Sequence, residues 1–182
     1  MAETTVALEG EFIGRRITVR LERVRLDDGT ETLRDVVRHP NAVVIVPLDV
    51  NGQVVMVRQF RKAADETLLE LPAGVMDDDA SPLDAARREL REETGLDAEH
   101  LQQLGDFYAA PGTMTERLYS FLATGLYERP LPADSDERIT VERIPWEQAL
   151  QMARAGEIHD AKTLASFLMA EAALSFPHPL AR

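Results

Sequence analysis

Three glutamates lie close together near the middle of the sequence. Glu89, Glu92 and Glu93 are spaced i, i+3 and i+4, and at about 100° per residue an α-helix places all three on one face. Carboxylates at this spacing repel one another, so the pattern favours a cation between them. Mg2+ and Mn2+ are hard cations that prefer such oxygen ligands. A solvated acidic helix face is the alternative interpretation.

Cations held by carboxylates favour one kind of chemistry. They neutralise the oxygens of a diphosphate, hold it in one geometry and lower the pKa of a bound water. Phosphate esters resist attack because their negative charge repels nucleophiles, and cations at the site offset this barrier. The three glutamates therefore indicate metal-assisted hydrolysis of a diphosphate compound.

The helix that carries the glutamates is specified at both ends. Ser81 is a natural N-cap, and Pro82 fits the first helical position. Asp84 completes a Ser-x-x-Asp pattern that is similar to a capping box. Gly95 stands where the residue after a helix needs a positive φ. These signals predict a helix of about three to four turns.

The same stretch resembles the Nudix box, G-x5-E-x7-R-E-U-x-E-E-x-G-U, in which U is a bulky aliphatic residue. Gly74 takes the first position, and residues 88–96 supply the part from R-E-U to G-U at the right spacing. One position departs, because Ala80 stands where the box has Glu. Asp79 lies beside it and can partly take the place of the missing Glu. We therefore expect the loop to be held less firmly and the active site to be kept.

The resemblance implies a divalent metal, Mg2+ or Mn2+, and its ligands. Glu89 and Glu93 are the expected side-chain ligands, and the backbone carbonyl of Ala73 is a further one. Glu92 is then another ligand or a catalytic residue that orients its neighbours. The alternative for Glu92 is a pair with Arg88, one helical turn away.

Further segments resemble the ADP-ribose pyrophosphatase branch of that family. Pro111 lies 15 residues beyond Leu96, where a proline marks the branch. It belongs to the loop Ala110–Glu116, which is similar to S-P-G-x-x-x-E with Ala in the Ser place. Residues 58–61 read R-Q-F-R, close to the R-Q-Y-R of the branch, and residues 70–74 match its E-L-P-A-G.

This resemblance implies a set of substrate contacts. Arginine binds two phosphate oxygens with its planar guanidinium, and the other residues are expected to contact ribose or adenine. The implied contacts are Arg58 and Arg61 to the diphosphate, Glu70 to substrate or to an arginine, Glu116 to a ribose hydroxyl, and Phe12 and Met114 to adenine. The alternatives are strand-end arginines that balance nearby acids, an ordinary loop carboxylate, and a phenylalanine of the core.

The general base must come from elsewhere if the box glutamates hold metal. The branch carries it on an acidic loop before a late strand, and residues 134–139 resemble that segment. Glu137 is the expected base, with Asp136 in reserve. A solvated acidic loop is the alternative.

The elements around these residues indicate an α/β (α+β) fold. Period-two alternation and short apolar runs predict strands, and spacing of 3.6 residues predicts helices. The expected strands cover residues 12–26, 31–39, 42–48, 53–60, 68–71, 101–109, 117–123 and 138–144, and helices 146–155 and 161–174 follow the box helix. This order predicts an α/β or α+β sandwich around a mixed sheet. The resemblance implies the same Nudix-type arrangement, a central mixed β-sheet flanked by helices, preceded by an N-terminal β-hairpin subdomain.

Three regions follow from this order. Residues 1–40 are expected to form an N-terminal β subdomain, residues 41–176 the catalytic domain, and residues 177–182 a flexible tail. The hairpin has few apolar positions and needs a packing partner. The resemblance implies a homodimer, in which the N-terminal strands are commonly swapped between subunits.

Composition and charge argue against several kinds of binding partner and site. The chain has 182 residues, a formal net charge of -12 and no cysteine. The acidic balance argues against nucleic acid and anionic membranes as partners, and the missing cysteines exclude disulfides and thiolate metal sites. The first residues lack the apolar segment of a signal peptide, and no apolar run approaches the ~20 residues of a membrane span. We therefore expect a cytoplasmic protein.

The resemblance thus implies hydrolysis of the nucleotide sugar ADP-ribose to AMP and ribose 5-phosphate. Two other readings stay open. One is the same chemistry on GDP-mannose or UDP-glucose, since the base is recognised by a few contacts that the sequence does not display. The other is a catalytically weakened module that binds ADP-ribose without cleaving it, which only Ala80 favours. The acidic balance disfavours an RNA-cap hydrolase.

Overall fold

The computed structural model describes residues 2–76, 81–132 and 138–175. The chain divides into two compact units, and each is described by itself. The N-terminal unit comprises Met1–Asn41 and Phe107–Arg117. The main unit comprises Ala42–Asp106 and Leu118–Arg182. The predicted tail, residues 177–182, lies outside the described residues.

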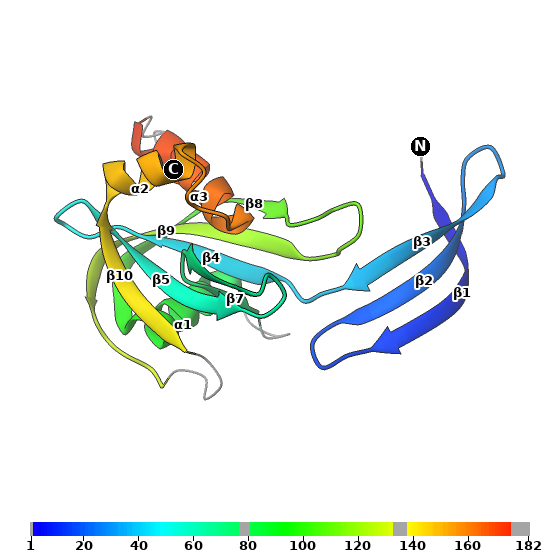
Figure 1. Cartoon of the computed structure of the whole chain (residues 1–182), viewed down its shortest axis with the longest axis horizontal. Coiled ribbons are helices and arrows are strands. Elements are labelled where there is room, and N and C mark those ends of the chain that lie inside the picture. The colour runs from blue at the N-terminus through cyan, green and yellow to red at the C-terminus, as the bar shows by residue number, and fades with distance from the viewer. Residues whose placement is uncertain (1, 77–80, 133–137, 176–182) are drawn as a thin grey trace. The chain divides into compact units, whose positions relative to one another are not determined.

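The N-terminal unit is built on an antiparallel sheet of order β1-β2-β3 (Figure 1). The hairpin of β2 (Thr18–Arg25) and β3 (Glu31–Arg38) confirms the predicted pairing. Strand β1 (Thr4–Ile13) was not predicted. Its register against β2 shifts twice, between Thr5 and Ala7 and between Leu8 and Gly10. Such bulges break the alternation from which a strand is recognised. The single strand predicted over residues 12–26 is divided, because β1 ends at Ile13 and β2 begins at Thr18.

The main unit contains two further sheets. One has the order β10-β5-β6 and the other β7-β4-β9-β8. Strand β4 runs parallel to β9 and antiparallel to β7, which confirms the predicted mixed sheet. The strands are β4 (Ala42–Pro47), β5 (Gln53–Arg61), β6 (Glu66–Glu70), β7 (Ala73–Val75), β8 (Leu96–Tyr108), β9 (Arg117–Glu128) and β10 (Ile139–Pro145).

Helix α1 (Pro82–Thr94) has the predicted ends. Ser81 is extended, with φ -68° and ψ 151°, and its hydroxyl accepts a hydrogen bond from the Asp84 amide at 3.1 Å. Gly95 has φ 74° and donates its amide to the Arg91 carbonyl. A residue with a Cβ is strained at that φ. These local interactions fix where the helix begins and ends.

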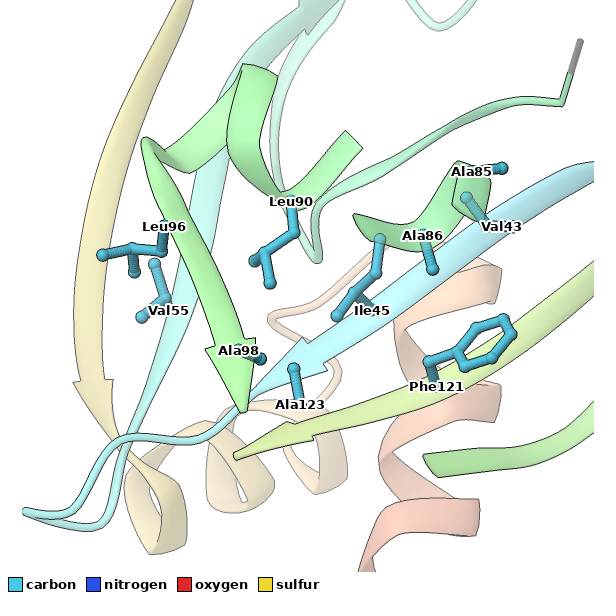
Figure 2. Packing of buried hydrophobic residues seen from close by; sticks show 10 residues of the cluster. All are labelled: Val43, Ile45, Val55, Ala85, Ala86, Leu90, Leu96, Ala98, Phe121 and Ala123. Carbon is cyan, nitrogen blue, oxygen red and sulfur yellow. The ribbon is translucent and has the colours of Figure 1, made fainter. Parts of the chain in front are cut away.

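The core of the main unit lies between α1 and the sheets (Figure 2). Every residue of β4 is buried, as predicted from its continuous apolar run. Figure 2 shows side chains of α1 facing those of β4, β5, β8 and β9. The cluster consists of Val43, Ile45, Val55, Ala85, Ala86, Leu90, Leu96, Ala98, Phe121 and Ala123.

Two helices lie on the other side of these strands from α1 (Figure 1). They are α2 (Trp146–Arg154) and α3 (Ala161–Ser175), close to the predicted ranges. Trp146 and Phe167 join them through an edge-to-face contact with ring centroids 5.3 Å apart. No helix in the described ranges is long and apolar enough to span a membrane.

Strand β8 starts earlier than predicted, at Leu96 directly after Gly95. The reason is Asp97, a polar residue that hides the strand pattern but is fully buried. Its carboxylate accepts hydrogen bonds from the side chains of Arg87 on α1 and Arg129 after β9. The buried charge is therefore paired, as burial requires.

Candidate functional site

The acidic face of α1 lies against strand β7. Glu89 and Glu93 are 8% and 7% exposed, a low value for carboxylates. A Cβ built on Gly74 would lie 2.1 Å from Cδ of Glu89, so only glycine leaves room for this carboxylate. Oε2 of Glu93 accepts a hydrogen bond from the Ala73 amide at 3.0 Å. Helix and strand thus bring together the three residues that the sequence proposes as metal ligands.

Arg88 holds this face together in the structure. Its guanidinium lies 2.7 Å from Oε1 of Glu89 and donates to Oε2 of Glu92 at 2.6 Å. It also donates to the carbonyl of Val75 at 2.9 Å. The pair of Glu92 with Arg88 is one of the two interpretations that the spacing allowed. Arg88 offsets the repulsion between the carboxylates and ties the helix to the end of β7.

The donor atoms of this site fit a hard divalent cation. The carboxylates of Glu89 and Glu93 and the backbone carbonyl of Ala73 offer oxygen ligands. Because Gly74 has no side chain, the Glu89 carboxylate of α1 can lie directly against β7. Within the described ranges, no group of three or more acidic or histidine side chains is already arranged to hold a metal ion. The carboxylates are instead engaged by Arg88 and by the Ala73 amide.

Glu70 is the centre of a second charged cluster, at the end of β6. The carboxylate is fully buried, and Arg61 donates to its two oxygens at 2.8 and 2.7 Å. Lys162 of α3 donates to the same carboxylate. Burial raises the pKa of Glu70, but the hydrogen bond from Arg61 and the charge of Lys162 outweigh it, so the net pKa lies below its usual value.

Arg58 belongs to the same strand as Arg61 but has another partner. It donates to Oε1 of Glu142 on β10 at 2.6 Å. This hydrogen bond raises the pKa of the Arg58 guanidinium and lowers that of the Glu142 carboxyl. Both sequence-predicted phosphate ligands are therefore paired with carboxylates in the structure.

Three predicted substrate contacts lie in the N-terminal unit. Phe12 on β1 is 66% exposed, so it is not a core residue of the chain as described. Met114 forms an isolated bridge with Val37 of β3. Glu116 lies 3.4 Å from Nδ1 of His39. This unit also contains a cavity of about 470 Å³, lined by Gly14, Arg15, Arg16, Ile17, Thr18, Arg38, His39, Pro40 and Thr115.

The remaining predicted positions lie outside the described residues. They are the expected base Glu137, its reserve Asp136, and Ala80 of the box. One charged residue of the main unit was missed by the sequence reasoning, namely Lys162. It belongs to no motif, and its partner Glu70 is 92 residues away along the chain, so no local pattern marks the contact.

Comparisons with known proteins identify the family of the chain. The model of the NUDIX domain matches residues 37–167. The chain is 38% identical to the ADP-ribose pyrophosphatase of Bacillus subtilis (strain 168), over 90% of this chain and 89% of that protein. It is 37% identical to the GDP-mannose pyrophosphatase of Enterobacter sp. (strain 638), over 84% of each.

A solved structure described as an ADP compounds hydrolase has the same fold. Its TM-score is 0.87, with 22% identity, and the match covers 99% of this chain and 98% of that one. The likeness extends over both units of the chain, and at this identity it supports the fold alone.

Proposed function

This chain belongs to the NUDIX domain family, and from that premise we propose that it hydrolyses the diphosphate of ADP-ribose to AMP and ribose 5-phosphate with a divalent metal. The observation that carries the proposal is the packing of Glu89 and Glu93 against Ala73–Gly74. The relative from Bacillus subtilis, an ADP-ribose pyrophosphatase that matches nine tenths of the chain, supports the substrate.

We place the metal, Mg2+ or Mn2+, between α1 and β7. Glu89, Glu93 and the carbonyl of Ala73 would hold it, and it would supply charge neutralisation at the diphosphate and a water of lowered pKa. Arg88 would then keep its hydrogen bonds to Glu92 and to the Val75 carbonyl. Glu92 in this arrangement orients Arg88, and through it the face of the helix.

Arg61, held in place by Glu70, would bind the anionic part of the substrate. Glu70 fixes the guanidinium of Arg61 through two hydrogen bonds, which lowers the entropy that an arginine loses when it binds phosphate. About a third of the Arg61 side chain stays exposed, so one side of it can reach a ligand. Arg58 contributes a second positive charge on the same strand.

The general base of this proposal lies outside the described ranges, and the remaining substrate contacts lie within them. Glu137, with Asp136 in reserve, takes the proton of the attacking water. A carboxylate is suited to this role because its usual pKa keeps it ionised at neutral pH. Glu116, Phe12 and Met114 are proposed to contact the ribose and adenine.

We further propose that the protein works as a homodimer in the cytoplasm. The subdomain of residues 1–40 would form the contact, and residues 41–176 would be the catalytic domain. Its sheet leaves large apolar side chains exposed, which single sheets of soluble proteins usually cover. These are Leu8, Phe12, Ile13 and Leu33. Sedimentation velocity would give twice the chain mass, and a monomer at micromolar concentration would contradict this part.

GDP-mannose is the second candidate substrate, because a GDP-mannose pyrophosphatase covers the chain at nearly the same identity. A panel of ADP-ribose, GDP-mannose and UDP-glucose with Mg2+ or Mn2+ separates the two. We expect the highest kcat/KM for ADP-ribose. A higher value for GDP-mannose would overturn the substrate assignment, and binding of ADP-ribose without release of AMP would identify a binding module.

A further inference from the structure

Helix α3 holds the segment before β7 through one buried hydroxyl. Thr163 is fully buried, and its Oγ1 donates to Oδ2 of Asp160 at 2.6 Å. The same oxygen accepts a hydrogen bond from the Leu71 amide at 2.9 Å. Asp160 is fixed in turn, because it also accepts from the Thr163 amide at 3.0 Å. Asp160, directly before α3, therefore fixes the orientation of the Thr163 hydroxyl.

The three residues from Leu71 to Ala73 are each held by a different element. Leu71 donates to Thr163 of α3, and the carbonyl of Pro72 accepts from the Ile45 amide of β4 at 2.9 Å. Ala73 donates to Glu93 of α1. Pro72 has no amide hydrogen, so the Leu71 amide is the last donor before Ala73. A change at Thr163 can thus reach Ala73 along the backbone, through the two peptide bonds that flank the conformationally restricted Pro72.

We propose that Thr163 is a positioning residue for the metal-binding face, acting through the backbone of Leu71–Ala73. This inference rests on the proposed metal site at Ala73, Glu89 and Glu93. Groups that orient metal ligands without touching the metal commonly affect its affinity. Thr163 does so from α3, outside the box.

A second buried hydroxyl on the same helix offers a matched control. Ser166, one turn further along α3, is also fully buried and receives a hydrogen bond from Ser120 of β9 at 2.9 Å. It joins the helix to β9, and it touches no residue of the segment 71–74 in the described hydrogen bonds. Loss of either hydroxyl weakens the packing of α3, and only loss of Thr163 releases the Leu71 amide.

The test compares Thr163→Val, Thr163→Ser and Ser166→Ala in the full-length protein. Mn2+ binding is measured by the electron paramagnetic resonance signal of the free ion, and exchange of the Leu71 amide by NMR. We expect Thr163→Val to weaken Mn2+ binding about 10-fold and to speed amide exchange at Leu71 and Ala73. Thr163→Ser, which keeps the hydroxyl, should restore both, and Ser166→Ala should leave both unchanged.

Equal Mn2+ affinity in Thr163→Val and wild type would overturn the inference, as would an equal loss in Ser166→Ala. Should Thr163→Val fail to fold, Thr163→Ala gives the same comparison with a smaller side chain. The result of this binding experiment can be distinguished from a failure of the proposed function. A wild-type protein that binds Mn2+ but leaves ADP-ribose intact would contradict the substrate assignment and leave the role of Thr163 standing.

Discussion

Replacement of Gly74 by alanine tests the geometry of the site most sharply. Gly74 lies in β7 opposite α1, and its φ is not in the left-handed region. Alanine therefore fits the backbone, and in a strand it loses less entropy on folding than glycine. The three heavy atoms nearest to the added methyl group all belong to the carboxylate of Glu89. The substitution thus displaces a proposed metal ligand without changing its charge.

The expected loss of rate in Gly74→Ala follows from the distance between the new Cβ and the Glu89 carboxylate. The new Cβ would lie 2.1 Å from Cδ and 2.2 Å from both oxygens of Glu89, where ordinary contacts begin at 3.4 Å. The carboxylate must therefore move by more than about 1 Å, and a misplacement of that size costs about 10²-fold in rate. We expect kcat/KM for ADP-ribose with Mg2+ to fall about 10²-fold in Gly74→Ala. The half-saturating concentration of Mg2+ should rise.

Gly105→Ala is the matched control. A Cβ at Gly105 in β8 would lie 3.4 Å from Sδ of Met169, an ordinary contact with a flexible side chain. This variant should keep the wild-type rate. Rates are measured by release of AMP over a Mg2+ titration, and circular dichroism checks that both variants are folded. A Gly74→Ala enzyme within a factor of about three of wild type would refute the metal role of Glu89, given the ~10²-fold loss expected for such a displacement.

Three further substitutions probe the charged residues. Glu70→Gln leaves Arg61 and Lys162 without their anion and should lower the free energy of unfolding at pH 7 by about 3 kcal/mol. The folded-state pKa of Glu70 lies below its usual value because of the hydrogen bond from Arg61 and the charge of Lys162. Its contribution to stability is therefore present above the pKa of the unfolded chain and is lost as the pH falls through the lowered pKa. Urea titrations at pH 7 and pH 3 should show the difference between variant and wild type narrowing at the lower pH, and a constant difference would contradict the pairing. Asp97→Ala removes the buried partner of Arg87 and Arg129 and should cost about 2 kcal/mol. At about 2–4 °C per kcal/mol for a chain of this size, the melting temperature should fall by about 4–8 °C, and an unchanged melting curve would show that these pairs add nothing. Glu137→Gln should reduce kcat about 10²–10⁴-fold with little change in the affinity for ADP-ribose measured by calorimetry, and a near-normal kcat would remove Glu137 from the mechanism in favour of Asp136.

Local signals were sufficient to predict α1. Ser81 and Gly95 act through hydrogen bonds to residues three or four positions away, and a sequence displays such neighbours directly. The apolar run of β4 identified the buried central strand for the same reason. The mixed sheet followed from the order of these elements.

Contacts between residues far apart in the sequence could not be predicted from local patterns. The cluster of Glu70 and Lys162 joins residues 92 positions apart, and the buried hydroxyl of Thr163 reaches Leu71 across the same interval. Strand β1 was missed because two bulges interrupt its alternation. In each case the deciding interaction is tertiary, and the sequence alone shows only an ordinary polar or irregular stretch.

We propose that the carboxylate face of α1 holds the metal for hydrolysis of ADP-ribose. The decisive experiment incubates the purified protein with ADP-ribose and Mg2+ and identifies the products by chromatography. We expect AMP and ribose 5-phosphate in equal amounts, with no reaction in the presence of a chelator. Intact ADP-ribose after incubation with Mg2+ or Mn2+, or products that retain the diphosphate, would contradict it.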